Sequence, residues 1–149
     1  MKKKLFVLLL AAVCCTAISK ADVVLDETNF PDANFRAAIT NITGVAEDGT
    51  LTDATIAEVT SLSLDSKSIS TLKGIEYFTA LKYLDCMSNQ LTTLDMSNNT
   101  ALISLNCYNN KLTSLVVSNN TALTSLVCSS NQLTSLDVSN NTALTYLVC

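Results

Sequence analysis

The sequence feature that most constrains the fold is an internal repeat with a fixed period of 21 residues. Three consecutive units, residues 81–101, 102–122 and 123–143, read LKYLDCMSNQLTTLDMSNNTA, LISLNCYNNKLTSLVVSNNTA and LTSLVCSSNQLTSLDVSNNTA. A fourth unit opens with LTYLVC and reaches Cys149, and residues 59–80 form a divergent copy of 22 residues. One such unit cannot bury its apolar side alone, so the units are expected to stack into a solenoid with a continuous core.

The apolar residues of each unit alternate as they do in a β-strand. In the segment Leu84-Asp85-Cys86-Met87, we expect Leu84 and Cys86 to enter the core and Asp85 and Met87 to face solvent. Each strand would pair in parallel with its equivalent one period away, at about 4.8 Å. A second, weaker copy of the motif later in the unit predicts short strands on both sides of each coil, with little or no helix in the repeats.

The motif L-x-x-L-x-[LC]-x-x-N-x-L inside this period is typical of leucine-rich repeats. Its asparagine recurs as Asn89, Asn110 and Asn131, directly after the first strand of each unit. A side-chain amide at this position can satisfy backbone groups that leave the ladder, so a structural role is predicted. Lys67 occupies the position in the first unit, where the turn should be less regular.

The first 21 residues read as a secretory signal peptide. Three lysines at positions 2–4 precede an apolar run over residues 5–18 and a small-residue pattern that predicts cleavage after Ala21. The run is shorter than the roughly 20 residues that cross a bilayer, so no transmembrane span is expected after cleavage. A lipoprotein acylated at Cys14 or Cys15 is an alternative, although neither follows the small residue that is expected there. The predicted location is therefore secreted or at the cell surface.

Charge argues against nucleic acid as a partner. The leader holds four of the nine basic residues and none of the thirteen acidic ones, so its removal leaves five against thirteen, a net charge of −8. Such a chain has no basic stripe with which to neutralise phosphates or anionic lipid headgroups.

Four cysteines remain after the leader, one in each repeat at the same phase: Cys86, Cys107, Cys128 and Cys149. An even number in an exported chain suggests disulfides, and parallel neighbours bring the Cα atoms within bonding range. Each cysteine nevertheless replaces an inward-facing leucine and would serve as a small core residue. Free, buried thiols are the favoured interpretation.

The residues required by common catalytic and metal sites are missing from the sequence. The chain has no histidine, which removes Ser/His/Asp and Cys/His arrangements and the usual zinc ligands. Asp95 and Asp137 share a phase two coils apart, roughly 10 Å, and are interpreted as solvated surface. The segment 44–53 resembles part of a calcium loop but lacks its carboxylates at the ligating positions. We therefore predict a protein that is not an enzyme and needs no cofactor or metal.

Residues 22–58 precede the repeats and are predicted to cover the first coil. Phe30, Phe35, Ala38 and Ile39 fit one face of a short helix entered at Pro31-Asp32, and a second helical turn is expected near residues 53–59. The domain organisation is thus a signal peptide over 1–21, an N-terminal cap over 22–58 and leucine-rich repeats over 59–149, the last one incomplete.

The stretches NFPDANFRAAI and DGTLTDATIAEVTSLSLDSKSISTLKGIEYFTALKYLDC, followed by tandem NQLTSLDVSNNTALTYLVC units, carry a family resemblance. The chain resembles bacterial secreted leucine-rich-repeat proteins of the internalin-like and Bacteroidetes surface-protein type. The resemblance implies a small helical cap on a parallel β-solenoid, placed outside the cell. It also implies that the concave strand face binds a protein or glycan partner at a host or neighbouring-cell surface.

Transferred to this sequence, the expected binding residues are the outward positions of that face. They are Tyr83, Asp85, Met87, Asn106, Tyr108, Val127, Tyr146 and Val148. The tyrosines are the first candidates, because a tyrosine offers contact area and a polar tip at modest entropic cost.

An alternative is a structural protein whose coils stack end to end through the open solenoid edge. The sequence stops in the middle of a coil, which predicts a fragment of a longer array.

Overall fold

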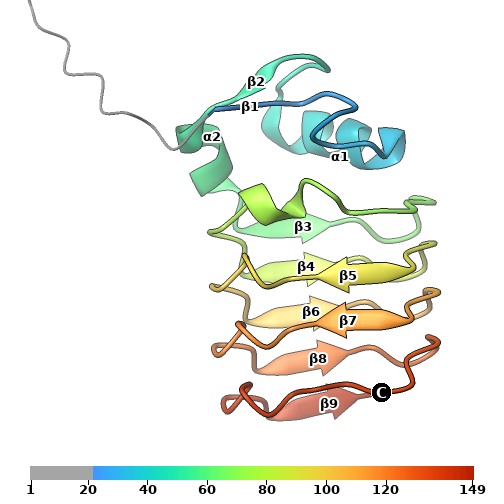
Figure 1. The fold of residues 1–149 in the computed structure, drawn as a ribbon. Coiled ribbons are helices and arrows are strands. Elements are labelled where there is room, and N and C mark those ends of the chain that lie inside the picture. The colour runs from blue at the N-terminus through green and yellow to red at the C-terminus, as the bar shows by residue number, and fades with distance from the viewer. Residues whose placement is uncertain (1–21) are drawn as a thin grey trace, which may run out of the picture.

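The computed structural model describes residues 22–149, and the predicted signal peptide lies outside the described residues. A small α/β unit sits at one end of a stack of flattened coils, with the C-terminus in the coil at the opposite end (Figure 1). The predicted architecture, a parallel β-solenoid with a 21-residue period and little helix in the repeats, is confirmed.

The N-terminal cap contains two helices and a two-stranded antiparallel ribbon. Strand β1 (Val23–Val24) pairs with β2 (Thr50–Leu51), helix α1 spans Ala33–Thr43 and helix α2 spans Asp53–Glu58. Helix α1 begins where Asp32 Oδ1 accepts the backbone N–H groups of Asn34 and Phe35. It ends at Gly44, whose φ of 73° is readily adopted by glycine.

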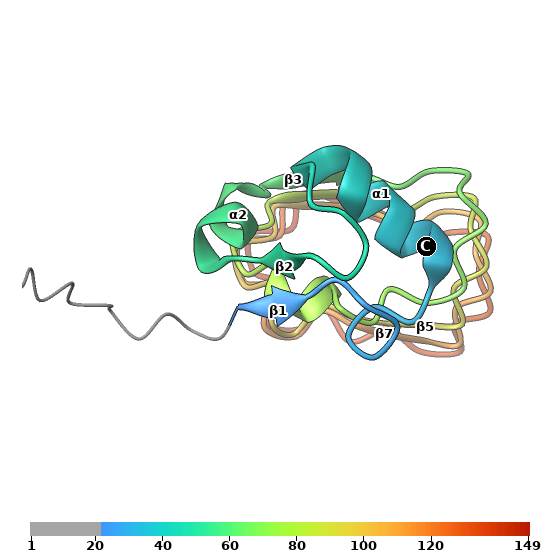
Figure 2. The same cartoon turned by 90° about the horizontal axis from the view of Figure 1, so that it is seen from above.

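Seen along the solenoid axis, the cap lies across the first coil (Figure 2). Phe35, Ala38 and Ile39 are buried on α1, as predicted. Phe30 is buried too, but it precedes the helix instead of lying on it, because Asp32 sets the helix start at residue 33.

A five-stranded parallel sheet runs the length of the repeats in the order β3, β4, β6, β8, β9. Its strands are β3 (Ser61–Ser63), β4 (Tyr83–Asp85), β6 (Ser104–Asn106), β8 (Ser125–Val127) and β9 (Tyr146–Val148). Each strand pairs with its equivalent one period away without a register shift, so identical repeat positions form straight rows. This in-register pairing follows from the repeat, since a one-residue slip would turn every leucine to solvent.

The opposite side of the coils carries the second set of strands that the sequence predicts. Here β5 (Thr93–Asp95) pairs in parallel with β7 (Ser114–Val116). In the first coil, the segment equivalent to β5 is followed by a 3-10 helix, η1 (Ile75–Tyr77). In the third regular repeat, the equivalent residues 135–137 form no strand.

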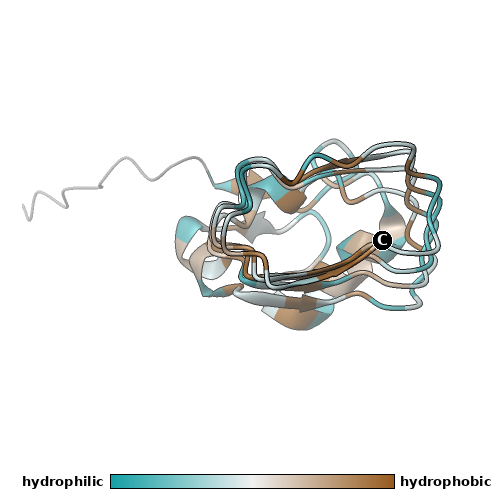
Figure 3. Ribbon diagram, turned by 90° about the horizontal axis from the view of Figure 1, so that it is seen from below, coloured by the Kyte–Doolittle hydropathy of each residue, from teal (hydrophilic) through white to brown (hydrophobic). Residues whose placement is uncertain are grey.

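The core is one continuous apolar cluster that runs from the cap through the coils. Viewed along the axis, the coils superpose, and positions of like hydropathy recur at the same place around each turn (Figure 3). The joint between cap and solenoid is aromatic: the Phe30 ring lies 5.7–6.3 Å, centroid to centroid, from those of Phe35, Tyr77 and Phe78. Gly74 lets the Phe30 ring approach, because a Cβ there would lie 2.1 Å from a ring carbon.

Candidate functional site

The five-stranded sheet gathers the predicted binding residues on one outward surface, which we call the sheet face. Six of the eight lie within its strands: Tyr83, Asp85, Asn106, Val127, Tyr146 and Val148. Met87 and Tyr108 lie two residues beyond the ends of β4 and β6, in the turns that follow. The sheet face is therefore a strand surface with an adjoining row of turn residues.

The tyrosines are the most exposed large side chains of this surface. Tyr83, Tyr108 and Tyr146 are 49%, 41% and 56% exposed. Tyr83 and Tyr146 occupy the same row on β4 and β9, with Ser104 and Ser125 between them, and Tyr108 occupies a different row. Among the described residues no aromatic pair joins the three, so each ring offers its own contact area.

Met87, Asn106 and Tyr108, three neighbouring members of the predicted binding set, contact one another. Asn106 Nδ2 donates to the Met87 sulfur at 3.5 Å, and Asn106 Oδ1 accepts the Tyr108 N–H. Met87 and Asp85 are both half-buried, and the Met87 sulfur lies against Asn106 of the next coil. These contacts hold the turn that carries Tyr108.

The acidic residues of the regular repeats close turns. Asp85, Asp95 and Asp137 each accept, through Oδ1, the N–H of the residue two positions later. The hydrogen bonds from Ser139 lower the pKa of the Asp137 carboxyl, because they favour its charged form. This geometry explains the repetition of aspartate by turn chemistry and requires no catalytic pair.

The predicted asparagine column is confirmed as structural. Asn110 Nδ2 donates to the carbonyls of Cys86 and Cys107, while its Oδ1 accepts the N–H of Leu91. Asn89 and Asn131 make equivalent bonds between their own coils. In the first coil, where Lys67 replaces asparagine, Ser68 adopts an additional positive φ of 58°, so this turn is less regular, as expected.

The sequence reasoning missed a second asparagine column on the other side of the coils. Asn99, Asn120 and Asn141 are buried, and each Nδ2 donates to two backbone carbonyls of the preceding coil. Each is the middle residue of an Asn-Asn-Thr triplet whose first asparagine is exposed. Two consecutive asparagines recur at the same position of each repeat, and this recurrence is the sequence signal for the second column.

The cysteines form an internal row. All four are free: Cys86, Cys107 and Cys128 are buried, whereas Cys149 is exposed, so within residues 22–149 the expectation of burial is wrong for Cys149. Burial and the neighbouring Cys107 raise the pKa of Cys86 well above its ordinary value. Burial, together with Cys128, raises the pKa of Cys107 to about 12. These thiols are therefore protonated at neutral pH and poor nucleophiles.

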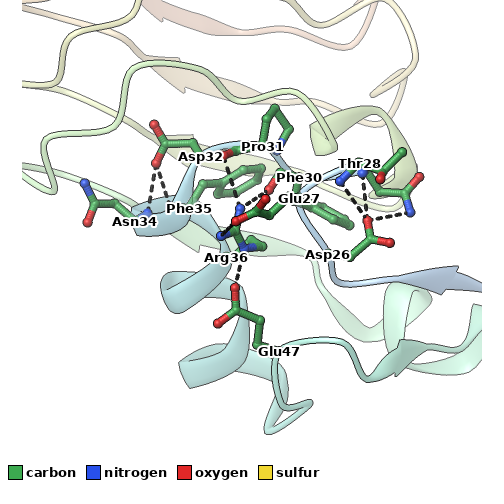
Figure 4. A network of polar contacts seen from close by, with 11 residues as sticks. Asp26, Glu27, Thr28, Phe30, Pro31, Asp32, Asn34, Phe35, Arg36 and Glu47 are labelled. Carbon is green, nitrogen blue, oxygen red and sulfur yellow. Dashed lines mark hydrogen bonds and ion pairs between the residues drawn. The ribbon is translucent and has the colours of Figure 1, made fainter.

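The cap holds the densest polar network, and it is structural (Figure 4). Arg36 is 5% exposed; its Nη1 donates to the carbonyls of Phe30 and Pro31, and its Nε donates to Glu47 at 2.7 Å. Glu27 lies 3.6 Å from its second terminal nitrogen. The buried guanidinium thus holds the chain before α1 against the loop after it.

Neither a metal centre nor a membrane helix emerges from residues 22–149. Within this range no three His, Cys, Asp or Glu side chains gather around a possible ion. None of its helices has the length and apolar character needed to cross a bilayer. An open hollow of about 350 Å³ lies between η1 and β5, but Lys73 and Glu76 in its lining are bonded to the backbone of Thr28 and Gly74.

The stacked coils, their asparagine columns and the cap together define a leucine-rich-repeat solenoid with a helical N-terminal cap. Two curated relatives match 71 residues of this chain, 48% of its length: internalin J of Listeria monocytogenes serotype 4b, at 44% identity, and internalin J of serovar 1/2a, at 46%. The chain is homologous to internalin J over this part, which is 8% of either relative's own length. No protein-family model matches the chain.

Solved structures extend the similarity to nearly all described residues. The functional domain of InlJ from Listeria monocytogenes, described as including a cysteine ladder, superposes with a TM-score of 0.81 at 42% identity over 88% of this chain and 29% of that one. The internalin InlF from the same species gives 0.62 at 26% identity, covering 87% and 46%. In this chain Cys86, Cys107 and Cys128 are buried at one position of successive repeats.

Proposed function

We propose that this chain is an extracellular or cell-surface binding module that recognises a protein partner through its sheet face. The observation that carries the proposal is the presence of three well-exposed tyrosines on one regular, rigid surface. Rigid strands present such rings at little entropic cost, and tyrosine is enriched in the residues that dominate binding energy. Similarity to internalin J supports a role at a cell surface.

Catalysis has little support in the described residues. The titratable groups of the sheet face, Asp65, Asp85 and the tyrosines, do not form a paired acid and base, and the buried thiols are protonated. The buried side chains of Arg36 and Asn110 are hydrogen-bonded to the backbone or to Glu47, and they stabilise the fold.

The test is binding of fluorescently labelled residues 22–149 to intact bacterial and mammalian cells, measured by flow cytometry. We expect saturable binding that is lost when surface proteins are removed by protease. A triple substitution of Tyr83, Tyr108 and Tyr146 to Ala should reduce binding at least tenfold, the equivalent of about 1.4 kcal/mol.

The matched control replaces exposed residues at one phase on the opposite side of the coils, Thr93, Ser114 and Ser135, by Ala. This variant should bind like the parent chain. Equal binding by the tyrosine variant would eliminate the sheet face, and binding that survives protease but is lost after glycosidase treatment would indicate a glycan partner instead.

A further inference from the structure

The sheet face changes its chemistry along the solenoid, and this change bears on how a partner is oriented. The inference rests on the proposed function. One outward row of the five strands, in register from the cap end, consists of Ser63, Asp85, Asn106, Val127 and Val148. Carboxylate and hydroxyl groups thus give way to aliphatic groups over the length of the sheet.

The cap end of the sheet face carries two carboxylates that no cation neutralises. Leu64 and Ser66 donate their N–H groups to the carbonyls of Asp85 and Met87, which places Asp65 opposite Met87 in the ladder and diagonal to Asp85. Asp65 accepts a hydrogen bond from the Ser63 hydroxyl, and Asp85 accepts the Met87 N–H. Both side chains are partly exposed, and the ion pairs found among residues 22–149 all involve Arg36.

The far end of the sheet face is uncharged. Residues 96–149 contain two charged side chains, Lys111 and Asp137, and neither lies on the strands of this sheet. Val127 is half-buried on β8, which pairs with β6 and β9. Tyr108 is in the turn after β6, which pairs with β4 and β8. Covering this region removes no charge from water and therefore avoids the large desolvation cost of an ion.

We propose that the sheet face binds its protein partner in a single orientation, with a lysine or arginine against Asp65 and Asp85 and an aliphatic or aromatic side chain against Tyr108 and Val127. Two strand spacings, roughly 10 Å, separate Asp85 from Val127. An extended segment laid across the strands spans this distance in about three residues. The partner is thus a segment in which a basic residue and an apolar one are about three positions apart.

The experiment uses a random dodecapeptide library displayed on phage, selected on residues 22–149. Enriched peptides are synthesised and their affinities are measured by fluorescence polarisation at 50 and 300 mM NaCl. We expect a basic residue about three positions from an aromatic or aliphatic one. The double variant Asp65→Asn, Asp85→Asn keeps the acceptors of the turns and should weaken binding at least tenfold at 50 mM NaCl, with a smaller loss at 300 mM.

Two further variants separate this inference from the proposed function. Asp95→Asn, on the opposite sheet, has the same turn hydrogen bond and should bind like the parent. The double variant Tyr108→Ser, Val127→Ser should lose affinity equally at both salt concentrations. If Tyr108→Ser, Val127→Ser loses binding while Asp65→Asn, Asp85→Asn does not, the proposed orientation is wrong although the sheet face still binds. The orientation is equally wrong if the enriched peptides lack the basic residue. If neither variant differs from Asp95→Asn, the proposed function fails as well.

Discussion

Asp32 ties the cap to the repeats, and its removal gives the most informative test of the fold. Its Oδ1 caps α1, and its Oδ2 accepts the backbone N–H and the hydroxyl of Ser70 at 2.8 and 2.7 Å, 38 residues away in sequence. Loss of a helix N-cap costs about 1 kcal/mol. Loss of hydrogen bonds to a charged acceptor costs about 1.5–3 kcal/mol, toward the lower value here because Ser70 is exposed and water can replace its partner.

We therefore expect Asp32→Ala to destabilise residues 22–149 by about 2–3 kcal/mol and Asp32→Asn by about 1–2 kcal/mol, because asparagine is also a good N-cap. Coils of a solenoid can unfold separately, so denaturant unfolding should be accompanied by hydrogen exchange of individual amides. The amides of α1 should exchange faster, while those of β6 and β8 should change little. Equal acceleration in both regions, or none in α1, would refute the reasoning.

The pH dependence supplies a second measurement on the same residue. Burial raises the pKa of Asp32, but hydrogen bonds from Ser70 and Phe35 outweigh it, so the net pKa lies below the ordinary 3.8. A carboxyl whose pKa is depressed on folding contributes stability that is complete above its unfolded pKa and is lost as pH falls through the folded one. The difference between the parent and Asp32→Asn should thus be constant above about pH 5 and shrink below pH 3.8.

Four other substitutions or measurements test separate parts of the structure. Gly74→Ala should destabilise by about 3 kcal/mol in thermal unfolding, since φ is 104° and the methyl group would meet the Phe30 ring. Asn110→Ala should cost about 3 kcal/mol in urea titrations by leaving buried carbonyl and N–H groups without partners; a loss below 1 kcal/mol would contradict its assigned role. Ser66→Asn should stabilise by about 0.5 kcal/mol, because φ is 55° and asparagine tolerates this region better; a lower melting temperature would count against strain at this turn. Thiol titration of native residues 22–149 at pH 8 should detect Cys149 alone, and all four cysteines after denaturation.

The sequence predicted the repeat architecture because the same local pattern recurs in every unit. Leu84 and Leu105 share a phase, and parallel in-register pairing is the arrangement that buries both. The asparagine column was also predictable, since an amide directly after a strand can bond only to backbone groups nearby. By contrast, the role of Asn99 depends on carbonyls contributed by Ile75 and Phe78, more than 20 residues earlier, and no local pattern reveals such partners.

The cap illustrates the same limit. Its helices could be predicted from Pro31-Asp32 and the apolar spacing, yet the joint between Phe30 and Gly74 depends on how the cap docks on the first coil. The burial of Arg36 among Phe30, Pro31 and Glu47 likewise arises from loops meeting in space.

For the candidate site, the sequence by itself determined which side chains alternate outward, because a strand has a period of two. The tertiary structure decided how they are distributed: Met87 lies against Asn106, Tyr108 lies in the turn two residues beyond β6, and Asp65 lies diagonal to Asp85 at the cap end. The physical reason is that alternation fixes the direction of a side chain, whereas its neighbours come from other coils through the hydrogen-bond ladder.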